Sequence, residues 1–555
     1  MEKGANGMKK TAFLSVLSSA KAAILRMPRI VLLPLGAVLM ALCLLFPKIG
    51  ALQWLSMVPM LLYLFGKNER ERIGIRKAYG LGLLYFYAFY LVIWHWFVDL
   101  YPMEFAGVSK GEAIGLIAIC WFGLSLLQTV FSALTFPVFV ALSRTRLLKK
   151  APILLPFLFA SVYTVAEWSQ TFTWAGVPWA RLALGQSECG VLFHSASLFG
   201  SYFITFAIVS VNGLVAYAVL HLDRVRLAAI VCAAVFALHA GVGLIGYLSA
   251  DTHSGEGIVV AAVQGNVGSS NKWTAESNQK SYAIYEKYTA EASAAGAELV
   301  VFPETFLPYS LTEDNALGKY VRDLAVRYRV TIRCGAFHYE GDQHYNGIFT
   351  VYPDGTVSST VYAKRRLVPF GEFVPMREVI EVLIPPLADM NILSSDLDPG
   401  TDSAIVQTEA GPVGTLVCFD SIYEQLTLET VRDGAQLICL STNDSWFLDS
   451  VGVYMHHTQA RLRAVESGRY IIRSADTGIS SIISPRGEAD AELPPLVDGV
   501  SISTVYPTAS RTLYSYIGNL FIYLLIACEI ALAVDAMILL VKGKRSQKAD
   551  ASSAE

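Results

Sequence analysis

Charged residues are scarce in this sequence of 555 residues: Asp, Glu, Lys and Arg together make up 16% of it, against about 25% in soluble domains. Apolar residues make up 54% and the mean hydropathy is +0.46, which indicates a membrane protein. The eight cysteines show no paired spacing and no CxxC motif, so we expect neither a disulfide framework nor a cysteine-based metal site. The net charge of −3 and the absence of a Lys/Arg-rich run of the nucleic-acid-binding type give no reason to expect a nucleic acid as partner.

The apolar residues are concentrated in eight segments that could each cross a bilayer. A hydrocarbon core of about 30 Å requires about 20 helical residues, and the candidates are residues 30–46, 52–65, 79–98, 113–142, 152–168, 191–220, 227–248 and 516–541. The second is short, and the fourth is long enough to be tilted or broken at Pro137. The first segment lacks a following small-residue cleavage site, so we expect a retained anchor rather than a signal peptide.

Basic residues mark one side of the predicted membrane segments. They cluster before the first segment and after the second, fourth, sixth and eighth, whereas the alternate short loops carry only Lys48, Lys110 and Arg181. Because positive charge is retained on the cytoplasmic side, the pattern predicts that both termini lie inside. Residues 249–515 are then expected outside the cytoplasm.

The sequence predicts three parts: a transmembrane helical bundle at 1–248, an extracytoplasmic domain at 249–510, and a transmembrane helix with a basic cytoplasmic tail at 511–555. In the middle part, strand-like runs alternate with helical stretches, which predicts a layered α/β domain. The runs are at 257–266, 297–305, 330–337, 355–364, 413–419, 435–443, 469–475 and 479–487, and the helical stretches at 280–295, 313–328, 423–433 and 453–467.

Several of the strand-like runs end on a polar or reactive residue, and these residues are Glu304, Lys364, Cys418, Asn443 and Asp444. Ligand sites of layered α/β domains form at the carboxyl ends of strands. A carboxylate, an ammonium and a thiol at such ends would suit acyl transfer through a thioester, with Glu304 as base and Lys364 stabilising the oxyanion. The alternative is a structural cysteine at 418 with Asp420 as a capping residue, and the residues alone leave the two interpretations equally supported.

Three motifs resemble the signatures of the nitrilase superfamily, whose triad is Glu-Lys-Cys: "FPETFLP", "YAKRRLVPFGEFVP" and "VCFDSIYE". With "QGNVGSSNKW", "EWSQTFTWAGVPWARLALGQ", "STNDSWF" and "QARLRAVESGRYIIRSADTGISSII", the chain resembles the membrane-bound branch of that superfamily, the apolipoprotein N-acyltransferases. The resemblance implies a multi-pass α-helical membrane protein with an extracytoplasmic α/β nitrilase-like αββα sandwich domain. It also implies the bacterial inner (cytoplasmic) membrane, with the catalytic domain on the periplasmic side.

The resemblance assigns roles residue by residue. Cys418 would be the nucleophile, Glu304 the general base and Lys364 the third member of the triad. Glu372 would be a second glutamate that supports the oxyanion or the attacking amine. The implied substrate-binding residues are Trp273 and Trp446 at the substrate entrance and Gly176 in a membrane-proximal loop.

One departure from the family pattern lies beside the thiol. Where the family has Cys-Tyr-Glu, this chain has Cys418, Phe419 and Asp420, so the carboxylate is shorter and the tyrosine hydroxyl is missing. We count Phe419 and Asp420 as supporting residues, and Tyr423 is the candidate to supply the hydroxyl. Glu167, at the end of a predicted segment, is expected to brace the loop that follows it.

The resemblance implies a two-step reaction with no cofactor. Cys418 takes an acyl chain from a phospholipid, and the N-terminal amine of a diacylated lipoprotein then attacks the thioester, all at the lipid bilayer. No metal is expected, because His456 and His457 are adjacent and so point to different faces of a helix. The alternatives are a membrane-tethered amidase that releases the acyl group to water, and a transporter with an external binding domain, for which the segments carry few ionisable residues.

Overall fold

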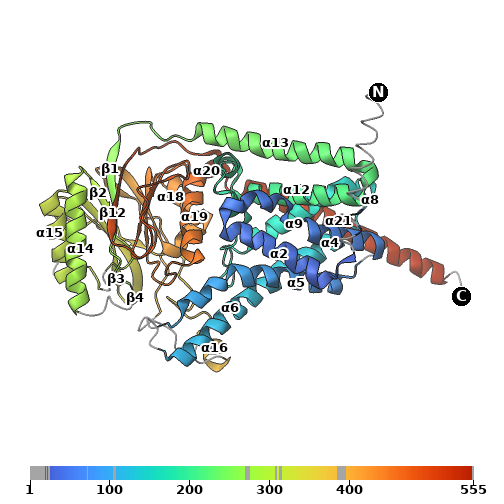
Figure 1. Ribbon diagram of the computed structural model, residues 1–555, viewed down its shortest axis with the longest axis horizontal. Coiled ribbons are helices and arrows are strands. Elements are labelled where there is room, and N and C mark those ends of the chain that lie inside the picture. Colours follow the sequence, from blue (N-terminus) through green and yellow to red (C-terminus); the bar gives the residue numbers. More distant parts are fainter. Residues whose placement is uncertain are drawn as a thin grey trace.

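The computed structural model of the protein describes residues 26–71, 73–103, 108–268, 275–306, 309–311, 315–383 and 396–552, together with residues 19 and 22. A helical bundle lies beside an α/β domain, and the chain returns to the bundle at its C-terminal end (Figure 1). Two connections join the parts: one follows helix α13 (Val225–Ser249), and the other leads into helix α21 (Leu520–Ser552).

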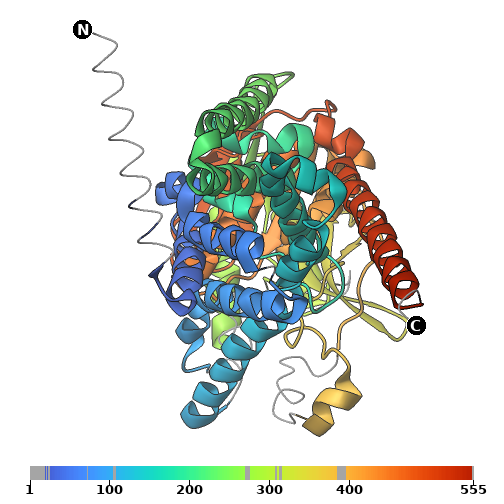
Figure 2. The ribbon, with the colours of Figure 1, turned by 90° about the vertical axis from the view of Figure 1, so that its right-hand side faces the viewer.

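The bundle is built from long apolar helices. Besides α13 and α21 they are α2 (Arg29–Leu45), α4 (Val58–Glu71), α5 (Ile75–Ile93), α6 (Lys110–Ser132), α7 (Thr135–Leu142), α9 (Leu155–Ser169) and α12 (Ser201–Leu220). Within the described residues, seven helical segments are long and apolar enough to cross a membrane, and α21 lies at the periphery of the bundle (Figure 2). The first predicted segment corresponds to α2, which has 17 residues and is too short to be counted among the seven.

Short helices connect and flank the long ones. They are η1 (Pro47–Leu52), α3 (Gln53–Ser56), η2 (His95–Leu100), α8 (Arg146–Lys150), η4 (Pro152–Leu154), η5 (Leu182–Gln186), α10 (Gly190–Phe193), α11 (Ala196–Phe199), η6 (Leu222–Arg224), α16 (Arg377–Leu383), η7 (Cys418–Ile422) and α20 (Leu513–Ile517).

Two of the predicted segments are interrupted. The long fourth segment breaks between α6 and α7, which places Pro137 in the first turn of α7, where a missing N–H costs little. The sixth was predicted as one span over 191–220, and this was wrong. The chain turns at Gly200, where φ is +79° and a β-carbon would lie 2.5 Å from the ring of Tyr514, so the long helix begins only at Ser201.

The α/β domain is a sandwich of two six-stranded sheets. The first has the order β12-β1-β2-β3-β4-β5 and the second β11-β10-β9-β8-β7-β6. The first sheet consists of β1 (Ile258–Gln264), β2 (Leu299–Val301), β3 (Thr331–Glu340), β4 (Gln343–Val351), β5 (Tyr362–Ala363) and β12 (Gly499–Val505). The second consists of β6 (Val406–Thr408), β7 (Gly411–Val417), β8 (Leu437–Thr442), β9 (Ile471–Ala475), β10 (Ser481–Ile483) and β11 (Ala489–Asp490).

Helices cover the outer face of each sheet. Helices α14 (Ala275–Ala294) and α15 (Ala316–Tyr328) cover the first sheet, whereas α18 (Glu424–Arg432) and α19 (Val451–Ser467) lie between the second sheet and the bundle (Figure 1). Apolar side chains such as Val260, Leu299 and Ile472 fill the space between the sheets. The predicted αββα sandwich is therefore confirmed.

The bundle and the α/β domain share one hydrophobic core. The largest apolar cluster runs from bundle residues such as Trp179 through Met455 and Leu462 of α19 to Leu440 of β8. Burial of apolar surface stabilises a contact by about 25 cal/mol per Å², and here the same cluster stabilises both parts. The α/β domain is thus fixed on the bundle rather than tethered to it.

The strand predictions failed in parts of both sheets: the edge strands β6 and β11 of the second sheet were not predicted, and the larger errors lie in the first sheet. Residues 355–364 were predicted as a strand, but only β5 at their end is one. The strand β4, which was not predicted, pairs along the whole of β3 through a turn at Gly341 with φ +61°. Its polar start, Gln-His-Tyr-Asn-Gly, obscured the strand pattern. Strand β12 was missed as well, and it pairs with β1 from the far end of the domain.

Candidate active site

Three chain segments bring the predicted triad together at the ends of their strands. Glu304 lies in the turn after β2, Lys364 directly follows β5, and Cys418 directly follows β7. The Nζ atom of Lys364 lies 2.8 Å from Oε1 of Glu304. Cys418 packs against a cluster that contains Tyr362 of β5, two residues before Lys364, so the three predicted residues share one site.

The ammonium of Lys364 is held between two carboxylates. It is 1% exposed, and it lies 2.9 Å from Oε2 of Glu372 as well as close to Glu304. Burial alone would lower the pKa of Lys364, but the charges of Glu304 and Glu372 outweigh it and raise that pKa well above its usual value. The lysine is therefore a permanent cation at neutral pH.

Both carboxylates are fixed by further hydrogen bonds. Asn346 on β4 donates through Nδ2 to Glu304 at 2.7 Å and to Glu372 at 2.9 Å. The other oxygen of Glu304 accepts from the backbone N–H of Asn443 at 2.8 Å, and that of Glu372 accepts from the N–H of Val368 at 2.8 Å. Asn346 was not among the predicted site residues, because it lies on the strand that the sequence analysis missed.

The thiol of Cys418 sits on a sharp turn between a strand and a helix. Cys418 is half-buried and has φ +47°, a conformation that side chains with a β-carbon rarely adopt. Desolvation, followed by the charge of Glu304, raises the pKa of the thiol well above its usual value, although Lys364 opposes the shift. The thiol is therefore protonated at rest, and attack on a carbonyl requires a base.

The carboxylate of Asp420 braces this turn. It is fully buried and accepts from the N–H of Val417 at 3.0 Å, the N–H of Arg366 at 2.8 Å and the hydroxyl of Tyr362 at 2.8 Å. Burial raises the pKa of Asp420 to about 6. Because the carboxylate of Asp420 is hydrogen-bonded to two backbone N–H groups and to Tyr362, this side chain stabilises the turn rather than facing a substrate.

The aromatic neighbours of the thiol point toward the bundle. Phe419 packs edge-on against Tyr423, with ring centroids 5.5 Å apart. Tyr423, the candidate for the missing hydroxyl, donates to the carbonyl of Gly176 at 3.4 Å, and the hydroxyl on Asp420 comes from Tyr362 instead. A β-carbon at Gly176 would lie 2.3 Å from the carbonyl oxygen of Gln170, so the tight loop requires glycine.

The two predicted tryptophans are placed differently. Trp446 is half-buried in the loop after β8, beside the segment whose backbone binds Glu304. Trp273 lies outside the described residues. Substrate binding by Trp446, Trp273 and Gly176 stays a prediction.

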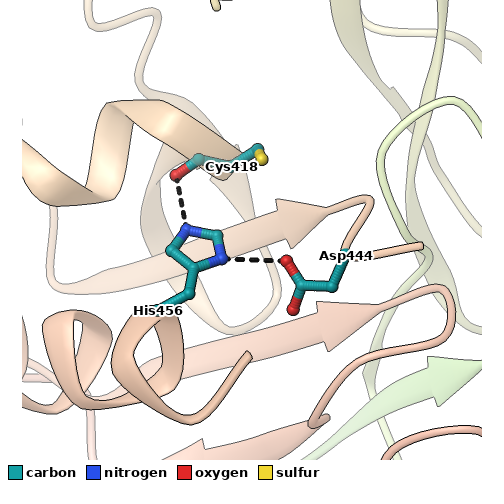
Figure 3. A group of neighbouring side chains, drawn as sticks. All are labelled: Cys418, Asp444 and His456. Carbon is teal, nitrogen blue, oxygen red and sulfur yellow. Dashed lines mark hydrogen bonds and ion pairs between the residues drawn. The ribbon is translucent and has the colours of Figure 1, made fainter. Parts of the chain in front are cut away.

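A histidine that the sequence analysis considered only as a metal ligand lies under the thiol. His456 of α19 places Nδ1 2.8 Å from Oδ1 of Asp444 and Nε2 3.2 Å from the carbonyl oxygen of Cys418 (Figure 3). Asp444 also accepts from Arg473 at 2.7 Å and from Thr442 at 2.8 Å. Asp444 was noted as a residue at a strand end, but nothing in its spacing from His456 revealed the contact.

This group does not fit a metal ion. One ligand atom from each of Cys418, Asp444 and His456 lies within 4.8 Å of the others, but both nitrogens of His456 are hydrogen-bonded within the protein. Burial alone would raise the pKa of Asp444, yet Arg473 and His456 hold it well below its usual range. The carboxylate is already neutralised by Arg473.

A buried group of charges fixes the site on the bundle. Arg181, from the loop before η5, forms an ion pair with Glu424 at the start of α18 and donates to the carbonyl of Ile422 at 3.2 Å. Arg463 of α19 lies 3.8 Å from Glu424 and 2.9 Å from Glu466. All four charged side chains are at most 1% exposed, so each depends on the others for its counter-charge.

Glu167 braces the same loop, as predicted. Its carboxylate accepts from the N–H of Leu182 at 2.9 Å and from the hydroxyl of Thr205 at 2.7 Å. The loop that carries Arg181 is therefore tied to helices α9 and α12 before it reaches the α/β domain.

Both parts of the chain are similar to known proteins. Residues 259–513 match the family model of carbon-nitrogen hydrolases, and residues 36–214 match that of the apolipoprotein N-acyltransferase N-terminal domain. An apolipoprotein N-acyltransferase of Geobacter metallireducens is 29% identical over 91% of this chain and 94% of its own. One from Methylococcus capsulatus is 30% identical over 76% of this chain and 80% of its own.

Among solved structures, an amidase from Nesterenkonia sp. covers 49% of this chain and 97% of its own, at 17% identity and a TM-score of 0.36. The relatives named N-acyltransferases match across the bundle and the α/β domain together. The chain belongs to the apolipoprotein N-acyltransferase family.

Proposed function

We propose that this protein transfers a fatty acyl chain from a phospholipid to the N-terminal amine of a diacylglyceryl-cysteine lipoprotein, through a thioester on Cys418. The observation that carries the proposal is the shared site of Glu304, Lys364 and Cys418, with Lys364 2.8 Å from Glu304, on a domain that shares its core with a membrane bundle.

In the first step Glu304 takes the proton of the thiol while Sγ of Cys418 attacks the ester carbonyl of the donor. Because the pKa of the thiol is raised, this proton transfer has to accompany the attack. Lys364 stabilises the oxyanion of the tetrahedral intermediate. The intermediate breaks its bond to the lipid oxygen, and Glu304 returns the proton to that oxygen, so that a lysophospholipid leaves.

In the second step the amine of the acceptor attacks the thioester. Glu304 takes a proton from the attacking nitrogen and delivers it to the departing sulfur, so Cys418 returns to its thiol form. Glu372 helps to keep Lys364 in place while Glu304 is protonated, because Lys364 then retains one carboxylate partner at 2.9 Å.

The surroundings of the site suit lipid substrates. Phe370 and Ile380, from the segment around Glu372, pack against an apolar cluster of α6. Met376, Val379 and Val382 in the same segment are exposed. Removing an acyl chain from a bilayer costs about 0.8 kcal/mol per CH₂, which favours an enzyme that takes its substrates directly from the lipid.

We also propose that the site lies on the periplasmic face of the bacterial inner membrane. Helix α8, which carries Arg146, Lys149 and Lys150, lies at the end of the bundle opposite the α/β domain (Figure 1). By the positive-inside rule this end faces the cytoplasm. A cysteine replacing Lys280 on α14 should react with a membrane-impermeant thiol reagent from the periplasm only, and labelling from the cytoplasm would contradict the proposed orientation.

Intact-mass measurement of the purified protein with phospholipid tests the function. We expect one acyl adduct on the wild type, none on Cys418→Ala, and an unchanged adduct on the control Cys189→Ala, which removes an exposed thiol. Addition of a diacylated lipopeptide should move the acyl group to the amine of the peptide. Appearance of free fatty acid instead would identify an amidase, and an adduct on Cys418→Ala would contradict the proposal.

A further inference from the structure

The conformation of Cys418 has to be maintained by its neighbours. A φ of +47° is unfavourable for a residue with a β-carbon, and such strain persists only where surrounding contacts hold it. Two side chains contact the carbonyl oxygen of this residue: Ser421 donates from Oγ at 2.7 Å, and Nε2 of His456 lies at 3.2 Å. Ser421 belongs to the same turn, whereas His456 comes from a different helix.

The imidazole of His456 stands between the carboxylate of Asp444 and the backbone carbonyl of Cys418. Nδ1 lies 2.8 Å from Oδ1 of Asp444 and 3.3 Å from Nη2 of Arg473, and Nε2 lies 3.2 Å from both the carbonyl oxygen of Cys418 and Oγ of Ser421. Asp444 is itself fixed by Arg473 and Thr442. A chain of hydrogen bonds therefore runs from β9 through the end of β8 to the nucleophile.

The bundle fixes the face of the same ring. Trp179 stacks on His456 with centroids 5.8 Å apart and planes at 25°, and its carbonyl accepts from Gln459 of α19 at 3.0 Å. Trp179 belongs to the loop that also carries Arg181, so a change in the position of the bundle would reach His456 directly.

We propose that His456 is a positioning residue for the nucleophile: together with Asp444 it holds the carbonyl of Cys418, and it thereby aims Sγ at the acyl donor. Trp179 fixes the position of the His456 ring relative to the bundle. It thereby also fixes the position of the Cys418 thiol relative to the lipid. The assignment rests on the acyl-transfer function proposed above. The hydrogen-bond contacts of His456 are with Asp444, Arg473, Ser421 and the backbone carbonyl of Cys418, so its effect is on geometry.

A pair of substitutions of similar size separates positioning from packing. His456→Gln keeps a donor near the place of Nε2, which faces Cys418, whereas His456→Asn keeps one only near Nδ1, which faces Asp444. We expect His456→Asn to lower the rate of thioester formation about 100-fold, since small misplacements of reacting groups have effects of this size, with an unchanged KM for phospholipid. His456→Gln should stay within about tenfold of the wild type.

Equal rates in the two variants, or a wild-type rate in His456→Asn, would overturn the proposal. Should neither variant fold, Trp179→Leu removes only the stacked ring and is expected to lower the same rate about tenfold. A wild-type rate in Trp179→Leu would then contradict the coupling to the bundle.

Alkylation of Cys418 by iodoacetamide, followed by peptide mass, keeps this inference separate from the proposed function. It reports on the thiol without any lipid. We expect His456→Asn to change the alkylation rate and His456→Gln to retain the wild-type rate. If the wild type forms no thioester, the function proposal fails; if both variants alkylate like the wild type, the positioning role fails.

Discussion

The two helical layers of the α/β domain differ in what they contact: the outer layer has water on one side, and the inner layer has the membrane bundle there. Helix α15 in the outer layer is amphipathic and buries only one stripe, which consists of Leu317, Gly318, Val321, Leu324 and Ala325. Helix α19 in the inner layer has 17 residues and buries nearly all of them, including two histidines, an arginine and a glutamate. The difference arises because α19 has the second sheet on one side and the membrane bundle on the other.

Polar residues have different surroundings in the two layers. The charged side chains Lys319 and Arg327 on α15 remain in contact with water, so their identity matters little for folding. Each buried polar side chain on α19 has lost its water and needs a protein partner: His456 has Cys418 and Asp444, Gln459 has the bundle loop, and Arg463 has Glu466. The inner layer is thus both an interface between the two parts of the protein and the support of the nucleophile.

The largest expected contrast between the layers concerns their ion pairs. Glu424→Ala should leave the buried guanidinium of Arg181 without its main partner, and loss of one partner of a buried pair typically costs about 3–5 kcal/mol. The equivalent change in the outer layer is Glu286→Ala, which breaks an exposed pair with Arg327 and should leave thermal stability unchanged. Thermal unfolding in detergent, followed by circular dichroism, measures both.

Two results would contradict the expected difference between the ion pairs of the two layers. A wild-type melting temperature for Glu424→Ala would mean that water or another carboxylate, such as Glu466, replaces the lost charge. A large loss in Glu286→Ala would mean that the outer layer depends on its surface charges. The double variant Glu424→Ala with Arg181→Met should recover part of the stability, because it removes the uncompensated charge.

A smaller contrast concerns a neutral side chain. Gln459 is fully buried and donates to the carbonyls of Trp179 at 3.0 Å and Pro178 at 3.4 Å. Gln459→Ala should leave these carbonyls unpaired, at a cost of about 1–3 kcal/mol, measured in the same unfolding experiment. Lys319→Ala, an exposed position on α15, is the matched control and should have no effect, whereas equal effects of the two substitutions would contradict the comparison.

The sequence predicted the outer layer and the four central strands of the second sheet, β7 to β10, but not the edge strands β6 and β11. The hydrophobic runs of β8 and β9 are fully buried central strands, and that of β7 is buried from Val413 on. The amphipathic pattern of α15 follows directly from its one-sided burial. The convergence of Glu304, Lys364 and Cys418 was also predictable, because each follows a strand end and the motifs resemble those of a known family.

The side-chain contacts of the inner layer could not be predicted from the sequence. Helix α19 has no single apolar stripe, since the bundle covers the face that would otherwise be polar, so its sequence says little about which side chains meet. The partners of His456 and Arg463 come from segments distant in the sequence, and Asn346 lies on a strand with a polar start. Contacts of this kind depend on tertiary packing, which no local pattern encodes.

The smallest expected effect concerns the thiol that the inner layer supports. The pKa of Cys418 is raised by desolvation and then by Glu304, so a thiol below its pKa should be alkylated about tenfold faster for each added pH unit, with no plateau up to pH 9. Glu304→Gln removes one of the charges that raise the pKa. At pH 8 this variant should therefore react with iodoacetamide faster than the wild type, by about threefold to tenfold, while it loses acylation by phospholipid.

The exposed Cys189 in the same protein is the internal control, and peptide mass reports the alkylation of each site separately. Its rate should be the same in the wild type and in Glu304→Gln, because no change is made near it. A slower reaction of Cys418 in the variant would show that Glu304 activates the thiol even toward a small reagent. The high proton affinity of the thiol would then come from desolvation alone, and the carboxylate would act on it as a base in every reaction.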